Sequence, residues 1–171
     1  MAKHVFLTGE IQIGKSTALR RFLENTGFSA DGFMSHIVNA EVGRELYLAR
    51  FDSILGESDS RLCARVNFSN TEVLSDVFDT HGAKIVASSG KRTLIVMDEL
   101  GRMEQNSPRF IAAVMAKLDA DTRVVGVVKK ADCEFLDAVR ARTDIELITV
   151  TKENRDTVPP VLTTIFKDLA R

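Results

Sequence analysis

Nine consecutive residues near the start of the chain have the types and the spacing of a phosphate-binding loop. The first eight fit the pattern G-x-x-x-x-G-K-[ST], the Walker A motif, and the nine are Gly9, Glu10, Ile11, Gln12, Ile13, Gly14, Lys15, Ser16 and Thr17. Glycines let such a loop turn its N–H groups toward phosphate oxygens, and the following helix adds a positive dipole. Lys15 would contact the β- and γ-phosphates, and the Ser16 hydroxyl would bind Mg²⁺. The alternative is a glycine turn with an exposed lysine.

Two residues inside this loop bear on its affinity for nucleotide. Glu10 carries a negative charge close to where phosphates would lie, so we expect its side chain to point outward. Gln12 fits the loop sterically if its φ is negative, because positive φ values favour glycine.

An apolar run over residues 93–97 ends in two adjacent carboxylates, Asp98 and Glu99. Successive side chains of a strand point to opposite sides, so the two can take different roles. Asp98 would hold Mg²⁺, usually through a water, and Glu99 would orient or deprotonate an attacking water. The alternative is a solvated acidic turn.

A further positive charge could stabilise the transition state of a phosphate reaction. Arg102 is favoured because it lies four residues past Asp98, and Arg140 and Arg142 are the other candidates. Lys129, directly after an apolar run, could supply a polar group there. For Arg102 and Lys129 the competing interpretation is an ordinary solvated side chain.

The elements that position these residues follow from hydrophobic periodicity and turn residues. The predicted strands cover residues 4–8, 32–38, 44–51, 93–97, 123–128 and 145–150. The first predicted helix covers residues 15–25, and a second starts at Asn70 or Thr71, weakens at Gly82 and resumes over 85–88. A third follows Ser107 and Pro108, and a short one runs from Asp132 to Arg142. The last starts at Val158 and carries Pro159 and Pro160. We expect Ser107 and Asp132 to cap their helices. The strands at 32–38 and 44–51 form a hairpin, a loop covers 52–61, and each strand of the remainder is followed by a helix, which predicts a mostly parallel sheet between helices.

Composition sets the wider frame. The chain has 171 residues, 44% of them apolar and 27% charged, with a formal net charge of −1. One domain over residues 1–171 is expected, and the net charge argues against nucleic acid or a membrane surface as a partner. Without an export signal or an apolar span of about 20 residues, a cytoplasmic location is expected. Cys63 and Cys133 suggest neither a zinc site nor a disulfide.

Four stretches together resemble the nucleoside-triphosphatase family known as THEP1, the cancer-related nucleoside-triphosphatases. They are residues 9–17, 31–33, 98–104 and 150–155. The blocks D-E-x-G-x-M-E and T-x-E-N-R are the most specific of them. The resemblance implies a three-layer P-loop NTPase fold of the α/β class, with a mostly parallel central sheet, helices on both faces and an added β-hairpin. It also implies Mg²⁺-dependent hydrolysis of several nucleoside triphosphates (ATP, GTP, CTP and UTP) to diphosphate and phosphate.

Position by position, Lys15, Ser16 and Asp98 match the family's phosphate and metal positions, and Glu99 matches its presumed water-activating carboxylate. Residues 10–13 depart from the family's usual loop, which contains Pro and Gly. Asn154 and Arg155 follow the last strand, on the side of the sheet where ligands collect in such folds. They could contact the nucleotide base, or they could belong to a helix-capping segment.

Two other functions stay open on the sequence. A nucleotide or nucleoside kinase would need an acceptor site, for which residues 52–65 are available, with Arg61 and Arg65 as acceptor-phosphate ligands or as solvated arginines. A non-catalytic nucleotide-binding module would bind nucleotide tightly without turnover. Protein partners are not predicted.

Overall fold

A short strand and the helix after it position the phosphate loop. The computed structural model describes residues 2–51, 59–92 and 94–170. Strand β1 (His4–Thr8) is followed by the loop and then by α1 (Lys15–Thr26), as predicted. Gly27 ends the helix with a left-handed φ of 63°, and its N–H bonds to the Leu23 carbonyl.

Within the described residues, eight strands form one sheet in the order β5-β4-β3-β2-β6-β7-β1-β8. The strands not yet placed are β2 (Ala30–Asn39), β3 (Arg44–Arg50), β4 (Ser60–Val66), β5 (Thr71–Val73), β6 (Leu94–Leu100), β7 (Arg123–Val128) and β8 (Ile145–Thr149). Strands β2, β6, β7, β1 and β8 pair in parallel, while β3, β4 and β5 extend the sheet antiparallel from β2. The phosphate loop therefore begins at the end of a central parallel strand.

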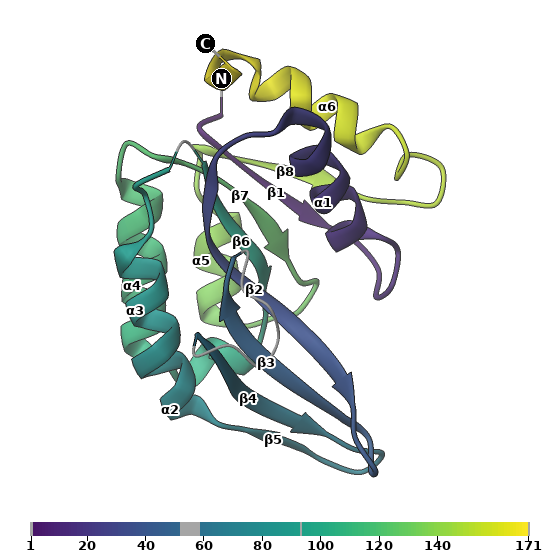
Figure 1. Cartoon of the computed structure of the whole chain (residues 1–171), viewed down its shortest axis with the longest axis vertical. Coiled ribbons are helices and arrows are strands. Elements are labelled where there is room, and N and C mark those ends of the chain that lie inside the picture. Colours follow the sequence, from purple (N-terminus) through teal and green to yellow (C-terminus); the bar gives the residue numbers. More distant parts are fainter. Residues whose placement is uncertain (1, 52–58, 93, 171) are drawn as a thin grey trace.

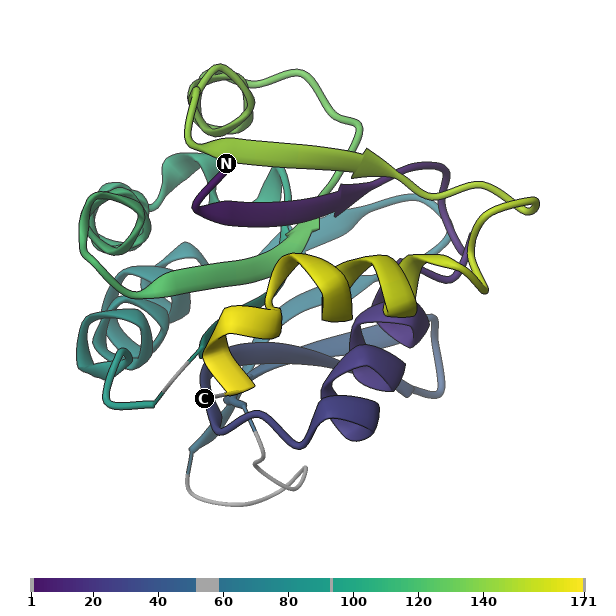
Figure 2. The same cartoon turned by 90° about the horizontal axis from the view of Figure 1, so that it is seen from above.

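Helices cover both faces of the parallel part, which gives the predicted three layers. Helices α1 and α6 (Val158–Ile165) lie on one face, and α3 (Ala83–Ser88), α4 (Pro108–Asp119) and α5 (Glu134–Arg140) lie on the other (Figures 1 and 2). Two apolar clusters fill the spaces between the layers. Phe22 and Phe166 belong to the first, and Phe33 and Phe110 to the second. The apolar strands thus fix the sheet from both sides.

Strand β2 approaches β6 so closely that a side chain is excluded at one position. A Cβ on Gly32, whose φ is 121°, would lie 2.0 Å from the Val96 carbonyl oxygen. The neighbouring carboxylate of Asp31 accepts hydrogen bonds from the N–H groups of Gly90 and Lys91, just before β6. The block at 31–33 therefore fastens two strands together.

The antiparallel part departs from the sequence prediction. The hairpin of β2 and β3 is confirmed, but β4 begins inside the predicted loop over 52–61 and β5 replaces the predicted start of a helix at 70 or 71. The helical segment starts later, as α2 (Ser75–Val77), continues as a π-helical turn over Phe78–Gly82 and ends as α3. Residues 52–58, and Thr93 of the predicted strand 93–97, lie outside the described residues.

Two predicted helix caps are wrong. The Ser107 hydroxyl donates to the Ser75 carbonyl oxygen instead of capping α4. The Asp79 carboxylate accepts the N–H groups of Arg109 and Phe110 in its place, at 2.8 and 3.2 Å. Helix α5 is preceded by Cys133 and not by Asp132. A cap borrowed from a distant segment leaves no local signal in the sequence.

Helix α6 starts at Val158 with Pro159 and Pro160 in its first turn, as predicted. No helix in the described part of the chain is long and apolar enough to cross a membrane.

Candidate active site

The phosphate loop curls tightly between β1 and α1. Gly9 has a φ of 140°, and a Cβ there would lie 2.5 Å from the carbonyl oxygen of Val150, so only glycine fits. The Lys15 side chain folds back over the loop and donates hydrogen bonds to the carbonyl oxygens of Gly9 and Glu10, at 3.0 and 2.6 Å. Its pKa is lowered, mainly because burial disfavours the charged form. Both of these carbonyl partners are neutral, so an anion bound in the loop would give the Lys15 ammonium a negatively charged partner.

The two unusual loop residues behave differently. Glu10 points outward as expected, because 76% of its side chain is exposed and it forms an ion pair with Lys130 at 2.8 Å. Gln12 has a φ of 60°, so the condition of a negative φ, under which a side chain fits without strain, is not met. The glycine that other loops favour is here replaced by a residue held in the left-handed region.

The side chains of Asp98 and Ser16 lie close to each other. Asp98 is buried and accepts a hydrogen bond from the Ser35 backbone N–H at 3.3 Å. Burial raises the pKa of this carboxyl, while the Ser35 N–H and the nearby Ser16 side chain oppose the shift. A hydroxyl and a carboxylate are hard oxygen donors, which is the donor set that Mg²⁺ prefers.

Within the described residues, no group of three or more His, Cys, Asp or Glu side chains forms a metal cage. Two oxygen donors are a set that suits an ion which keeps waters and takes further ligands from a phosphate, as Mg²⁺ usually does.

Glu99, the next residue, lies on the other side of the strand end. Its carboxylate forms an ion pair of 2.7 Å with the ammonium of Lys129, and both side chains are about one-third exposed (32% and 37%). Lys129 directly follows β7, the strand between β6 and β1. The pair thus joins the acidic end of β6 to the end of β7, the strand next to β1.

A second glutamate of the block at 98–104 is buried close by. The Glu104 carboxylate accepts the backbone N–H of Gly101 at 2.9 Å. Burial, against the opposing effect of these N–H bonds, raises its pKa to about 7. The sequence prediction gave Glu104 no role, although its place in a specific block was a signal that could have been used.

The arginine candidates separate into three positions. Arg102 is exposed at the start of the turn after β6, and among the described residues no ion pair joins it to the loop. Arg140 donates to the carbonyl oxygens of Lys129 and Ala131, so it supports the backbone beside the site. Arg142 pairs with Asp119 and Asp144, and its candidacy is wrong because Asp144 precedes β8, at the opposite edge of the sheet.

The segment after β8 returns to the phosphate loop. The side-chain oxygen of Asn154 accepts the Thr151 N–H and its amide nitrogen donates to the Thr149 carbonyl, so its polar groups shape their own turn. Arg155 lies against the loop, because a Cβ on Gly14 would be 3.9 Å from its Cδ. Its contact with nucleotide stays a prediction, and the structure favours the turn-forming role for Asn154.

The residues considered for a kinase acceptor lie on the antiparallel strands. Arg65 of β4 pairs with Glu45 and Glu72 on the neighbouring strands, at 3.3 and 3.2 Å. Such cross-strand pairs stabilise a sheet. Arg61 is exposed on the same strand.

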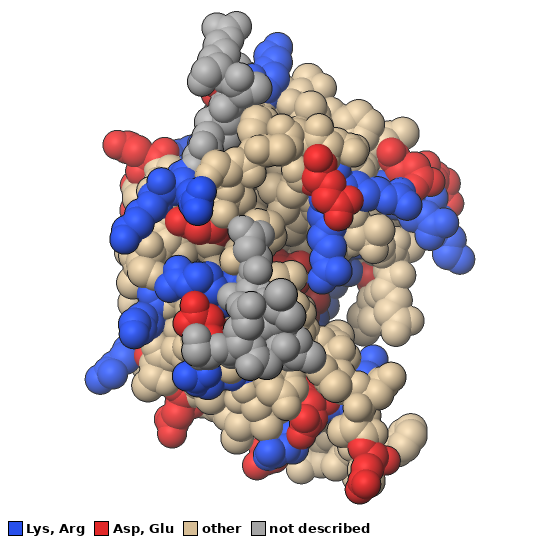
Figure 3. Space-filling view, in the orientation of Figure 1, with Lys and Arg blue, Asp and Glu red and all other residues tan. Residues whose placement is uncertain are grey.

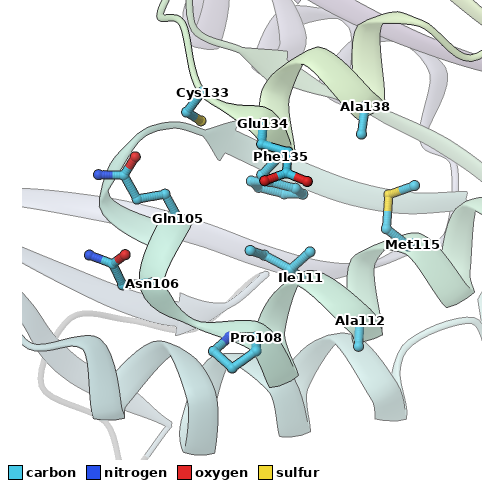
Figure 4. A pocket seen from close by; sticks show the side chains of 10 residues that line it. All are labelled: Gln105, Asn106, Pro108, Ile111, Ala112, Met115, Cys133, Glu134, Phe135 and Ala138. Carbon is cyan, nitrogen blue, oxygen red and sulfur yellow. The ribbon is translucent and has the colours of Figure 1, made fainter.

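Two other parts of the surface are an apolar groove and a face of mixed charge. A groove of about 500 Å³ between α4 and α5 is lined by apolar side chains such as Ile111, Met115 and Phe135, and its lining includes none of the predicted site residues (Figure 4). On the face drawn in Figure 3, basic and acidic side chains alternate over the described residues.

Comparison with known proteins places the chain among nucleoside-triphosphatases. The sequence matches the family model described as NTPase over residues 4–163. The nucleoside-triphosphatase THEP1 of Thermofilum pendens is 31% identical over 94% of this chain and 93% of that protein, and the human cancer-related nucleoside-triphosphatase is 30% identical over 96% of each. The crystal structure of THEP1 from the hyperthermophile Aquifex aeolicus has the same fold, with a TM-score of 0.77 at 23% identity over 95% of this chain and 98% of that one.

Proposed function

The chain belongs to the NTPase family, and we propose that it hydrolyses nucleoside triphosphates to diphosphate and phosphate with Mg²⁺, using Glu99 to activate water. The relatives are named as nucleoside-triphosphatases without a single base. ATP, GTP, CTP and UTP are therefore the proposed substrates.

One observation carries this proposal. The Ser16 side chain at the start of α1 lies close enough to the Asp98 carboxylate of β6 to oppose the rise in its pKa, although the two residues come from separate motifs. Glu99 lies beside them with its carboxylate partly exposed, at 32%. A carboxylate that water can reach, next to a metal position, is what hydrolysis needs in preference to transfer to an organic acceptor.

Each residue then has a distinct task. Lys15 and the N–H groups of the phosphate loop bind the β- and γ-phosphates, because the loop opens onto the N-terminus of α1. Glu99 orients a water toward the γ-phosphorus and accepts its proton. Arg155, against Gly14, lies where it can contact the rest of the nucleotide.

The residues present fit Mg²⁺. Ser16 and Asp98 would hold the ion together with phosphate oxygens and water. When bound, Mg²⁺ neutralises charge on the phosphates and makes the γ-phosphorus easier to attack.

The test measures products. Purified protein is incubated with each of the four triphosphates, with and without nucleosides and nucleoside monophosphates as acceptors. We expect multiple turnovers of diphosphate and phosphate in every case, unaffected by acceptor. A new phosphorylated acceptor would establish a kinase, and tight binding without turnover would establish a silent binding module.

A magnesium titration tests the metal position separately. Asp98→Asn should require more Mg²⁺ for half-maximal activity, because a neutral amide is a poorer partner for a hard dication. A midpoint identical to that of the wild type would contradict the assignment of Asp98.

A further inference from the structure

We propose that Lys129 is a second catalytic cation, which moves from Glu99 to the transferring γ-phosphoryl group when a triphosphate binds. This inference rests on the proposed hydrolysis and assigns a positive charge to the transition state from a residue other than the arginine candidates.

The order of the strands places Lys129 between the two halves of the site. Strand β7 lies between β6, which carries the acidic pair just before its last residue, and β1, which leads into the phosphate loop. Lys129 is the first residue after β7, and the carboxyl ends of parallel strands meet at one edge of the sheet. A side chain leaving β7 there can reach toward either neighbour.

Its backbone is held from two sides. The Lys129 N–H donates to the Leu100 carbonyl at 2.9 Å, and the Lys129 carbonyl accepts from the Arg140 guanidinium at 2.8 Å. Gly101 lies against the stem, since a Cβ there would be 3.2 Å from the Lys129 Cδ. The stem is therefore positioned by the backbone and Gly101, while the ammonium is held by the ion pair with Glu99 on a side chain that is 37% exposed. Movement to a phosphate would require exchange of this one ion pair.

The charges around Glu99 point to an anion. Three lysine ammonium groups lie around the phosphate loop and Glu99: Lys129 pairs with Glu99, Lys130 pairs with Glu10, and Lys15 donates to the loop carbonyls. Like charges gathered at one place are destabilising unless an anion joins them. Lys130 already has the exposed Glu10 as its partner, whereas the partner of Lys129 is Glu99, the carboxylate proposed to activate water.

The chemical step explains why moving the Lys129 ammonium from Glu99 to the γ-phosphoryl group would help hydrolysis. A water oxygen bonds to the γ-phosphorus while the bond from phosphorus to the β–γ bridging oxygen breaks, and its electron pair leaves with the diphosphate. One water proton passes to Glu99. Lys129, hydrogen-bonded to a γ-phosphoryl oxygen, stabilises the negative charge there, and the Glu99 carboxylate it has left becomes the proton acceptor.

Three variants test the role of Lys129. Lys129→Met removes the charge and should lower kcat by about 10² to 10³ fold with little change in KM, as for other single donors to a transition state. Lys129→Arg should restore part of the rate, because it restores a cation. Lys130→Met, the adjacent lysine with an exposed partner, should change the rate by less than about threefold. Equal rates for Lys129→Met and the wild type would overturn the proposal.

A double variant separates catalysis from mere support of Glu99. If Lys129 acted only by holding Glu99, adding Lys129→Met to Glu99→Gln would lower the rate no further. We expect an additional loss of at least about tenfold, because the phosphoryl group loses its cation independently of the base.

A binding measurement tests the role of Lys129 independently of whether the protein hydrolyses triphosphates. ADP with aluminium fluoride mimics the transferring phosphoryl group, and Lys129→Met should weaken its binding at least about tenfold more than that of ADP alone. Equal weakening would overturn the role of Lys129 even if the wild type hydrolyses ATP. A selective loss would support it even if no turnover were found.

Discussion

The two edges of the parallel sheet use charge in opposite ways. At the edge where β1, β6 and β7 end, Lys15 is buried without a carboxylate ion-pair partner among the described contacts, and Asp98 is buried with its pKa raised. At the edge where the strands begin, Arg142 is paired with two aspartates and Arg123 with Asp168. We propose that a nucleotide and Mg²⁺ supply the missing charges at the first edge, whereas the arginines at the second edge have their carboxylate partners within the protein.

His4 makes the same point at the second edge. It is fully buried at the start of β1, its Nδ1 accepts the Val124 N–H at 3.1 Å, and its Nε2 lies 2.9 Å from the Leu118 carbonyl oxygen. A nitrogen that accepts cannot also carry a proton, so the ring is neutral, and burial lowers its pKa. Every polar atom of the ring is satisfied, which is expected of a group that stabilises structure.

The comparison predicts that variants at the two edges affect different measurements. Lys15→Ala should have the largest effect on activity, lowering the rate and the affinity together by at least about 10² fold, because charge-assisted bonds of roughly 1.5 to 3 kcal/mol to two phosphates are lost. Its free energy of unfolding should change by less than about 1 kcal/mol, since two bonds and a desolvated charge disappear together. Phosphate release, calorimetric binding and urea unfolding measure the three quantities, and unchanged affinity would contradict the site.

Glu104→Gln tests how the buried Glu104, at the edge where the strands end, affects stability as the pH changes. The pKa of Glu104 is raised from 4.5 to about 7 in the folded protein, so the folded state binds more protons between these values. Its contribution to stability is present below pH 4.5 and is lost as the pH rises through 7, on the order of 3 kcal/mol.

The glutamine variant keeps an acceptor for Gly101 but cannot ionise. It should be more stable than the wild type at pH 8 and similar at pH 5, with the slope from Asp98 present in both proteins. Urea unfolding across this range is the measurement, and parallel curves would show that Glu104 is not held in its protonated form.

Arg142→Met should do the reverse of Lys15→Ala. The free energy of unfolding should fall by about 1 to 3 kcal/mol, because the bonds to Asp119, Asp144 and the Leu118 carbonyl are lost while the stem is kept. The hydrolysis rate at a temperature where the variant is folded should stay that of the wild type. A fall in rate without a fall in stability would return Arg142 to the site.

The sequence predicts the parallel half of the molecule well because its signals there are local. The apolar run before Asp98 and the glycine pattern around Lys15 can each be recognised within their own segment of sequence. The two motifs then lie together because the carboxyl ends of parallel strands lie at one edge of the sheet. Residues 71–73 instead form a strand because they pair with β4. The hydrophobic periodicity of a single segment does not predict such pairing.

The same distinction applies within the site. Lys15, Ser16 and Asp98 are recognisable by type and spacing, whereas the pairing of Glu99 with Lys129 depends on the spatial order β6-β7-β1. Arg142 was misplaced although the predicted elements indicate its position: a helix that links two parallel strands ends where the next strand begins, at the edge opposite the phosphate loop. The burial of Glu104, by contrast, depends on packing against distant elements.

The central claim is that the edge where β1, β6 and β7 end carries out hydrolysis with Glu99 as the group that accepts the proton of water. The most direct test compares nucleotide binding and phosphate release for the wild type, Glu99→Gln and a control, Glu146→Gln, on the exposed part of β8. Glutamine keeps the shape of residue 99 but not its basicity, so triphosphate binding should persist while release falls by about 10² to 10⁴ fold, and the control should match the wild type. Wild-type release by Glu99→Gln would contradict the account.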